Sequence, residues 1–355
     1  MDGGEHGGML PGGVAEGQNI GWICVLFCVV RFRGAAVSVT NGFGVWLPEG
    51  MWRSSLRGLS VNGESFRRFF LTLASQSVYF EWQQAVGQEG RHQRSRMLGA
   101  IVGDVIGSPY EQCNVKSTNF LLFSHGAQCT DDSVLTVATS DALMNGRDYC
   151  TTYQEYFHRF PNAGYGGRFV VWANRRESKP YNSWGNGSAM RSGPVGWARN
   201  TLQDVLDEAE RTAMVTHDHP DGILGAQVVA GCVFLARSEH SRERIREFVH
   251  DGAQYRLDRS LDQIRPGYEF DASCKGTVPV AVQAFLESSD FESAIRLAVS
   301  AGGDSDTIAC ISGAIAHAFY GAIPKHLLEP VLEIYMSPDL VEISLDFCKR
   351  FRVPV

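Results

Sequence analysis

Two short segments of this chain hold carboxylates and hydroxyls at a spacing that suits metal ions. In residues 130–133 a threonine is followed by two aspartates and a serine, and residues 302–307 read Gly-Gly-Asp-Ser-Asp-Thr. Hard divalent cations such as Mg²⁺ and Mn²⁺ prefer carboxylate and hydroxyl oxygens. The repeated combination of a threonine with two aspartates therefore predicts a centre for such ions.

Each acidic segment directly precedes an apolar run, so simple helix capping is the alternative interpretation. Thr and Asp are favoured at helix N-termini, where the helix dipole stabilises an anion. The run after the second segment places Ile308, Ile311 and Ile315 on one face, and its other face is small. A helix that is apolar or small on all sides is buried. Because an unpaired charge is very costly in a packed interior, two such clusters favour metal binding over capping alone.

A fifth carboxylate, Glu111, follows another apolar segment at residues 97–108. If Glu111 joins the four aspartates, the cluster carries five negative charges, while two helix N-termini supply only about half a positive charge each. The remaining charges would repel one another strongly at low dielectric. Two divalent cations would bring the site close to neutrality, and paired ions about 3.5–4 Å apart can activate a water molecule.

Helices are needed to position these acids. The sequence predicts a buried helix over residues 97–108, with glycines for close packing, and a helix from Val134 that ends at Gly146. The spacing of apolar residues predicts a third helix over residues 308–320. Further helices are expected at residues 151–160, 223–235, 239–252 and 280–286, and a short helix pair is expected after Pro324.

Composition restricts the class of protein. The chain has 355 residues with a net charge of −7, so a stable nucleic-acid partner is not expected. Its nine cysteines are scattered without a CxxC pair, which indicates reduced thiols in a cytoplasmic setting. The apolar run at residues 20–30 is too short to span a bilayer, and no Lys or Arg precedes it as in an export signal. No membrane association is therefore expected, and the oligomeric state stays open.

The first 96 residues differ from the rest of the chain in composition and in the periodicity of their apolar residues. Residues 1–17 are rich in glycine and are expected to be unstructured, and residues 31–96 show no sustained period. We therefore interpret residues 1–96 as an N-terminal extension that is poorly ordered or not native, with Met97 as the natural start. Residues 97–355 are interpreted as a single catalytic domain.

The motifs of this domain resemble those of the ADP-ribosylglycohydrolase family, which includes the dinitrogenase-reductase-activating glycohydrolases and the ADP-ribosylhydrolase-like proteins. The matching segments occur in the family's order and are residues 103–111, 130–133, 164–169, 185–191, 216–220 and 302–307. The resemblance implies an all-α fold with a binuclear Mg²⁺ or Mn²⁺ centre between helix N-termini. By motif position it implies the metal ligands Thr130, Asp131, Asp132, Asp304, Asp306 and Thr307.

The resemblance also implies roles for residues beside the metal centre. Glu111 is expected to contact a metal and to polarise the reacting centre, and Asp131 and Asp306 are expected to act in catalysis. The substrate-binding residues expected from the family's motifs are Gly166, Gly167, Phe169, Asn186, Gly187, Ser188, Met190 and His217.

Some of these segments allow a second interpretation. Residues 164–167 can be an ordinary loop, although bare glycine backbone can approach a ligand closely. A helix beginning near Ala189 would make residues 185–188 an anion site that suits a diphosphate. Arg191 can pair with phosphate or form an ordinary solvated or salt-bridged side chain. Residues 216–221 can hold a third metal or a helix cap at Asp221.

Aromatic and thiol side chains near the end of the domain raise two more questions. Tyr268 and Phe270 can offer a stacking face for adenine or pack in the core. Cys274 is interpreted as structural because no adjacent residue supplies a base.

Taken with the resemblance, the motifs predict a metal-dependent hydrolase that cleaves the glycosidic bond between ADP-ribose and an acceptor, reversing ADP-ribosylation. The partner is an ADP-ribosylated protein or a small molecule, and the acceptor linkage stays open. A non-catalytic ADP-ribose-binding protein with the same pocket is the first alternative. A two-metal phosphohydrolase is the second, and it would release phosphate rather than ADP-ribose.

Overall fold

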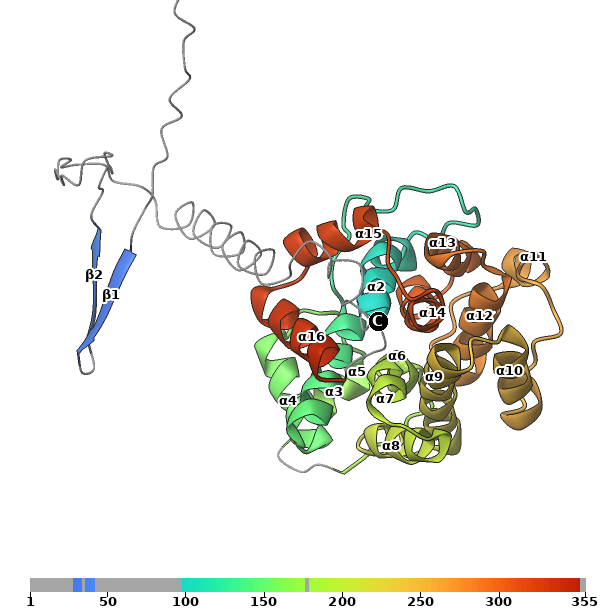
Figure 1. Cartoon of the computed structure of the whole chain (residues 1–355), viewed down its shortest axis with the longest axis horizontal. Helices are drawn as coiled ribbons and strands as arrows, with labels where there is room; N and C mark the ends of the chain where they lie inside the picture. Colours follow the sequence, from blue (N-terminus) through green and yellow to red (C-terminus); the bar gives the residue numbers. More distant parts are fainter. Residues whose placement is uncertain (1–27, 34–35, 42–97, 176–178, 352–355) are drawn as a thin grey trace, which may run out of the picture. The chain divides into compact units, whose positions relative to one another are not determined.

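A computed structural model describes residues 28–33, 36–41, 98–175 and 179–351 (Figure 1). The chain divides into two units, residues 1–71 and residues 72–355. In the first unit, strand β1 (Cys28–Arg33) pairs antiparallel with β2 (Ala36–Asn41). This hairpin was not predicted from the sequence. The expectations for residues 1–17 and for the start at Met97 lie outside the described residues, so the assignment of an extension stays a prediction.

The second unit is built from helices, which confirms the predicted all-α class for residues 98–175 and 179–351. The only pairing of strand type in those ranges is one isolated bridge between Gly185 and Ser273. The helices of the first half are α2 (Leu98–Glu111), α3 (Asp131–Asn145), α4 (Tyr149–Arg159), α5 (Gly167–Ala173), α6 (Gly187–Met190), α7 (Gly193–Ala198) and α8 (Leu202–Met214). Those of the second half are α9 (Pro220–Ser238), α10 (Arg242–Glu247), η1 (Phe248–Gly252), α11 (Leu261–Ile264), η2 (Arg265–Gly267), α12 (Cys274–Glu287), α13 (Phe291–Ala301), α14 (Ser305–Tyr320), α15 (Lys325–Pro330), η3 (Val331–Tyr335) and α16 (Pro338–Arg350).

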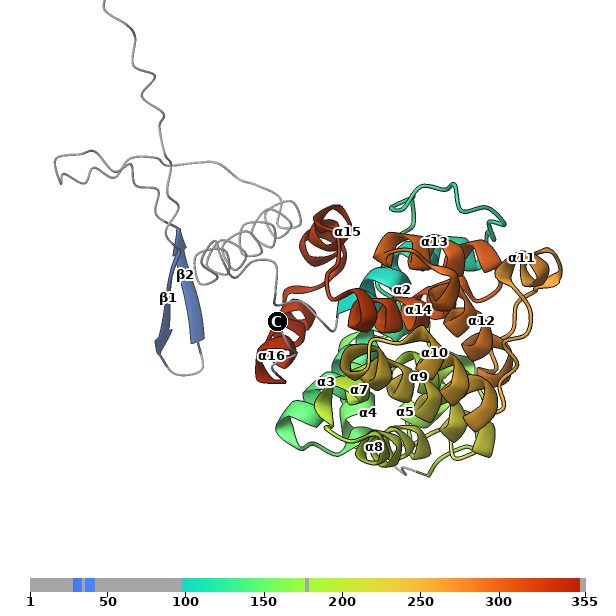
Figure 2. The same cartoon turned by 45° about the vertical axis from the view of Figure 1, so that its right-hand side comes forward.

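Helices α2 and α14 lie side by side in the centre of this unit (Figures 1 and 2). Three glycines of α2 make this approach possible. A Cβ atom added to Gly103 would lie 2.0 Å from the carbonyl oxygen of Ala309, and one added to Gly107 would lie 2.6 Å from the Cα of Asp306. Gly99 meets Gly313 in the same way. The glycines that the sequence suggested for close packing therefore bring the end of α2 against the first turn of α14.

Most helix boundaries follow local signals, but three expectations were wrong. The helix expected to begin near Ala189 is the four-residue α6, which begins at Gly187. The cap of α9 is His219, whose side chain accepts from the N–H of Asp221, so Asp221 is not the cap residue. The segment at residues 239–252 is not one helix, because α10 ends at Glu247 and a π-helical turn follows.

Helix α9 is apolar enough, by length and composition alone, to cross a membrane. However, 67% of its most apolar stretch is buried within the unit, where it packs against α6, α7, α8, α12 and α14. This burial is the pattern of a core helix.

Candidate metal centre and substrate pocket

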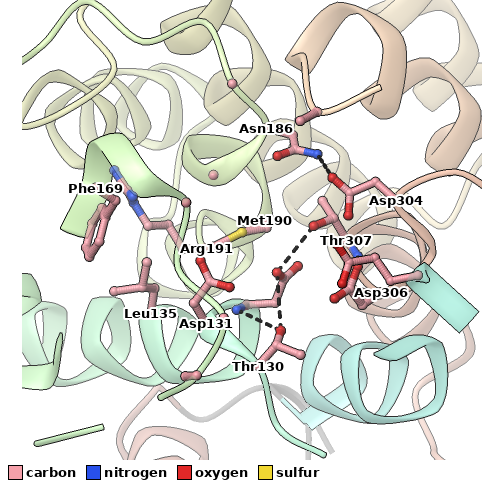
Figure 3. A pocket seen from close by; sticks show the side chains of 18 of the residues that line it. Thr130, Asp131, Leu135, Phe169, Asn186, Met190, Arg191, Asp304, Asp306 and Thr307 are labelled. Atoms are coloured by element: carbon pink, nitrogen blue, oxygen red, sulfur yellow. Dashed lines mark hydrogen bonds between the residues drawn. The ribbon is translucent and has the colours of Figure 1, made fainter. Parts of the chain in front are cut away.

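A cavity of about 370 Å³ opens where the N-termini of α3 and α14 meet the end of α2 (Figure 3). Fourteen of the fifteen residues predicted for the site line this cavity, and the exception is Ser188. Ser188 is buried, and its hydroxyl donates to the carbonyl oxygen of Gly222 on α9 at 2.7 Å. The predicted residues that line the cavity are Glu111, Thr130, Asp131, Asp132, Gly166, Gly167, Phe169, Asn186, Gly187, Met190, His217, Asp304, Asp306 and Thr307.

The acidic side chains from three helices form two overlapping groups. Carboxylate oxygens of Glu111, Asp304 and Asp306 lie within 4.8 Å of one another, and so do those of Asp104, Asp132 and Asp306. Asp306 belongs to both groups. The hydroxyl of Thr307 donates to Oδ2 of Asp132 at 3.2 Å, which joins the start of α14 to that of α3. The tertiary fold thus gathers two segments that lie far apart in the sequence.

Protein cations do not neutralise this cluster. Within the described residues, none of these carboxylates forms an ion pair with Lys, Arg or His. Asp132 and Asp306 are only 3% and 5% exposed, and Oδ1 of Asp132 is buried without a hydrogen-bond partner. Buried charges are ordinarily paired or bound to a metal. The donor set of carboxylates and hydroxyls fits hard divalent cations.

Crowding of the acids changes their protonation. Burial, reinforced by Asp104 and Asp304, raises the pKa of Asp131 to about 8. Burial together with the neighbouring carboxylates also raises the pKa of Asp132 and of Asp306 well above the usual range. The pKa of Glu111 is raised by its partial burial and then by Asp304. Without a cation, protons therefore reduce the repulsion in this cluster near neutral pH.

The capping alternative holds at one of the two helix starts. Thr130 caps α3, because its side chain accepts from the N–H of Asp132 at 3.2 Å. Asp304 occupies the N-cap position of α14, but its side chain makes no capping hydrogen bond. Instead, Oδ2 of Asp304 accepts from Nδ2 of Asn186 at 2.7 Å (Figure 3). Asn186 also donates to Oγ1 of Thr277 at 3.0 Å, so it links the loop before α6 to the acidic turn.

Another wall of the cavity is formed by Tyr181, Ser183, residues 185–187 and His217. A Cβ atom added to Gly187 would lie 3.3 Å from Nε2 of His217, so the loop backbone passes close to the imidazole. Nδ1 of His217 lies 2.7 Å from the hydroxyl of Thr216. Burial, followed by the nearby Arg191 and Arg168, lowers the pKa of His217 well below its usual value, so the ring is neutral. Among the described residues, both groups of side chains that could hold a cation consist of carboxylates alone. The structure therefore gives no support for a third metal at residues 216–221.

Arg191 is not solvated, and it forms no salt bridge with the residues that the structure describes. It is 0% exposed, and its guanidinium stacks on Tyr153 at 4.5 Å from the ring centroid. Its Nη2 donates to the carbonyl of Thr212 and to Oγ1 of Thr216, while Nε and Nη1 have no hydrogen-bond partner. Because Arg191 also lines the cavity, it gives that wall a buried positive charge opposite to the sign of the acidic end.

Aromatic residues divide between the core and the cavity. Tyr165 and Phe169 stack with ring centroids 5.2 Å apart, and Phe169 lines the cavity from α5. Phe270 also lines the cavity and is 58% exposed. Tyr268 instead packs against Gly303, and its hydroxyl donates to the carbonyl of Gly276. Phe270 is therefore the better candidate of the two for stacking on a base.

Two polar residues close to the acids were not predicted. Asp104 on α2 is fully buried beside Thr130, and burial raises its pKa to about 6 in spite of four hydrogen bonds. Asn114 pairs with Gly303 through both of its amide atoms, at 2.7 and 3.0 Å, and also donates to the carbonyl of Glu111. Asn114 thus connects the end of α2 to the turn before Asp304. The position of Asn114 in a loop gave no sequence signal, whereas Asp104 lies within the matching segment of residues 103–111.

Cys274 is buried, and burial raises the pKa of its thiol to about 12. A thiol in this state is a poor nucleophile, in agreement with a structural role.

Known proteins are similar to this chain in sequence and in fold. The sequence model of ADP-ribosylglycohydrolase matches residues 91–354. The ADP-ribosylhydrolase ARH3 of Mus musculus is 28% identical over 309 residues, which covers 64% of this chain and 83% of that protein. The ADP-ribosylarginine hydrolase Tri1 of Serratia proteamaculans is 24% identical over 291 residues, with 70% and 77% covered. A solved structure described as an ADP-ribosylglycohydrolase-related protein complex superimposes with a TM-score of 0.55 at 24% identity, covering 73% of this chain and 99% of that one, and supports the same fold.

Proposed function

The chain belongs to the ADP-ribosylglycohydrolase family, and we propose that it is a hydrolase that uses two divalent cations, Mg²⁺ or Mn²⁺, to release ADP-ribose from an acceptor. The observation that carries this proposal is the cluster of buried carboxylates without a protein cation, set at one end of a cavity. The opposite wall holds Arg191 and a neutral His217. An acidic end that takes cations and a positive wall that takes an anion suit a substrate with a diphosphate.

The metal ligands proposed from the cluster are Thr130, Asp131, Asp132, Asp304, Asp306 and Thr307. Bound divalent cations supply charge stabilisation and lower the pKa of a nucleophilic water. The protein's own groups must then orient the sugar and move protons. Asp131 lies in the cavity wall and is suited to accept the proton of the attacking water. Asp306 belongs to both groups of carboxylates, so it is placed to contact both cations.

Glu111 has the properties expected of an acid at the leaving group. It is only partly buried, at the end of α2, and burial and Asp304 raise the pKa of its carboxyl. A raised pKa allows a carboxyl to hold a proton near neutral pH and to donate it, as acids do in other glycoside hydrolases. Glu111 therefore combines partial exposure at the cavity with a raised pKa, and both properties suit a proton donor to the leaving group.

Substrate binding is proposed for the residues of the other walls. The loop with Gly166 and Gly167, together with Phe169, forms one side, and Asn186, Gly187, Met190 and His217 form another. No Cβ atom added to Gly166 or Gly167 would meet a heavy atom within 4 Å, so their backbone faces open space. This open backbone is available to a ligand. The acceptor is proposed to be a protein side chain or a small molecule.

A cytoplasmic location is part of the proposal. It is supported by Cys232, Cys274 and Cys310, which are buried thiols without a disulfide.

The test is release of ADP-ribose from arginine-linked and serine-linked ADP-ribosyl peptides, with and without Mg²⁺ or Mn²⁺. We expect cation-dependent release by the wild type and loss of turnover in Asp306→Asn. The matched control is Asp346→Asn, an exposed aspartate on α16, which should behave as wild type. Full activity of Asp306→Asn would refute the metal assignment.

The same assay separates the alternatives. Binding of ADP-ribose without release from either peptide would favour a binding protein, and release of inorganic phosphate would favour a phosphohydrolase. The complete set of acidic and hydroxyl side chains at the cavity supports the hydrolase.

A further inference from the structure

Asp104 is a fully buried carboxylate of α2 that contacts the first turn of α3 without lining the cavity. Its Oδ1 accepts from the hydroxyl of Thr130 at 2.7 Å. Its Oδ2 accepts from the backbone N–H of Thr130 at 2.9 Å and of Ser133 at 3.1 Å, and also from the Ser133 hydroxyl. All four donors therefore belong to two residues at the start of α3.

These contacts fix the direction of the Thr130 hydroxyl. A threonine hydroxyl has one hydrogen and two lone pairs, whereas a carboxylate offers only acceptors. The hydrogen goes to Asp104 at 2.7 Å, because the other acceptor, Oδ2 of Asp132, is 3.5 Å away. One lone pair accepts from the N–H of Asp132 at 3.2 Å. The second lone pair of Thr130 Oγ1 takes part in neither of these hydrogen bonds, and Thr130 lines the cavity.

We propose that Asp104 is a positioning residue of the cation site, which accepts a hydrogen bond from the Thr130 hydroxyl and so leaves a lone pair of Thr130 Oγ1 directed at a divalent cation. This inference rests on the proposed function, because it requires that the cluster binds cations. Partners that accept from or donate to a ligating group orient that ligand, and their removal typically weakens metal affinity about 10- to 100-fold.

A direct role of Asp104 as a ligand is the competing explanation. Its oxygens lie within 4.8 Å of those of Asp132 and Asp306. To bind a cation through Oδ2, however, Asp104 would have to release backbone N–H groups of Thr130 and Ser133 that have no other partner in this turn. Leaving buried donors unsatisfied is costly. The hydrogen bonds therefore favour the positioning role.

The variant that tests the proposal is Asp104→Asn, which keeps the shape of the side chain. Its single carbonyl oxygen can accept from the two backbone N–H groups, which leaves the amide nitrogen facing Thr130 Oγ1 as a donor. The hydroxyl oxygen then accepts twice, and its hydrogen turns toward the cavity. A hydrogen directed at the cation position should weaken cation binding.

The measurement is Mn²⁺ affinity of the full chain without substrate, by calorimetry or by the spin-resonance signal of free Mn²⁺. We expect Asp104→Asn to weaken Mn²⁺ binding about 10- to 100-fold. The same change should have no further effect in a Thr130→Val background, where no hydroxyl remains, and should keep its effect in a Thr130→Ser background. Non-additivity of this kind marks two groups that act through one contact.

The matched control is Ser133→Ala, which removes one donor to Asp104 and leaves the contact between Asp104 and Thr130 intact. It should bind Mn²⁺ as the wild type does. Thermal unfolding without metal reports whether each variant is folded. If Asp104→Asn does not fold, Thr130→Val against Thr130→Ser tests the same contact from its other end, because unchanged affinity in the valine variant would overturn the proposal.

Unchanged affinity in Asp104→Asn, or in Thr130→Val, would overturn the proposal. An equal loss from Asp104→Asn in the wild-type and Thr130→Val backgrounds would also overturn it and would favour direct ligation. A wild-type chain that binds no Mn²⁺ would instead refute the proposed metal centre itself.

Discussion

In the metal-free protein, the buried carboxylates should make stability depend on pH in a direction opposite to that of ordinary ion-paired acids. The unfolded-state pKa of Asp131 is near 3.8, and burial with Asp104 and Asp304 raises its pKa to about 8 in the folded state. The folded state then binds more protons, so stability falls as the pH rises between these two values. Below the lower value the effect vanishes, because both states are protonated.

The size of the effect follows from the linkage relation. A single carboxyl that is protonated only in the folded state costs about 1.4 kcal/mol of unfolding free energy per pH unit. Between about pH 5 and pH 7, Asp131 alone accounts for a loss of about 2.7 kcal/mol. For a helical unit of this size, that corresponds to a fall of the melting temperature of about 5–10 °C.

The assay is thermal unfolding of the wild type and of Asp131→Asn in a chelator, at several pH values in this range. The difference between the two proteins cancels the titration of groups elsewhere. We expect the variant to gain stability relative to wild type as the pH rises. Added Mg²⁺ or Mn²⁺ should stabilise the wild type, since a ligand at 100 times its Kd contributes about 2.7 kcal/mol.

A difference between the two proteins that does not change with pH would refute the electrostatic account of the cluster. If divalent cations do not raise the melting temperature of the wild type at neutral pH, the proposal that they neutralise the carboxylate cluster is refuted.

Three further predictions concern packing, positioning and ligand contact. Gly103→Ala should destabilise the protein by about 1–3 kcal/mol, because its Cβ would overlap the backbone of α14, whereas Gly166→Ala meets open space and should change stability little; denaturant unfolding compares the two. Asn114→Ala removes the paired contact with Gly303 and should cost about 1–3 kcal/mol of stability and weaken Mn²⁺ binding, which unfolding and calorimetry measure. Phe270→Ala should weaken ADP-ribose binding by about 0.5–1.5 kcal/mol and leave ribose 5-phosphate binding and stability unchanged, since the ring is exposed at the cavity and available to adenine. Equal loss for both ligands would argue against stacking.

The charge pattern of the cavity explains why one site can hold cations and an anionic substrate together. Carboxylates converge from α2, α3 and α14, and Arg191 lies fully buried in another wall. An unpaired buried guanidinium costs free energy unless an anion approaches it. The site therefore carries, in separate walls, the two kinds of charge that complement a metal-bound sugar and a diphosphate.

The sequence alone determined the class of the fold and most of the chemistry. Its helices follow from apolar spacing and from local stop signals such as Gly146, which has a left-handed backbone in the structure. Paired aspartates beside a threonine, repeated before two buried helices, indicated a cation site, because the cost of buried charge is a local property of residue type and surroundings. Fourteen of the fifteen predicted site residues line one cavity, and the resemblance to the family's motifs supplied those that are not acidic.

Only the tertiary structure decided how these residues share their contacts. The sequence could not show that the Asp304 side chain meets Asn186 and does not cap α14, or that Asp104 accepts a hydrogen bond from Thr130. Nor could it show that Arg191 is buried without a carboxylate partner among the described residues. Each of these depends on which helices lie side by side, and α2 reaches α14 through glycine contacts between residues about 200 positions apart. Residue type fixes what a side chain can donate or accept, whereas packing selects the one partner that it meets.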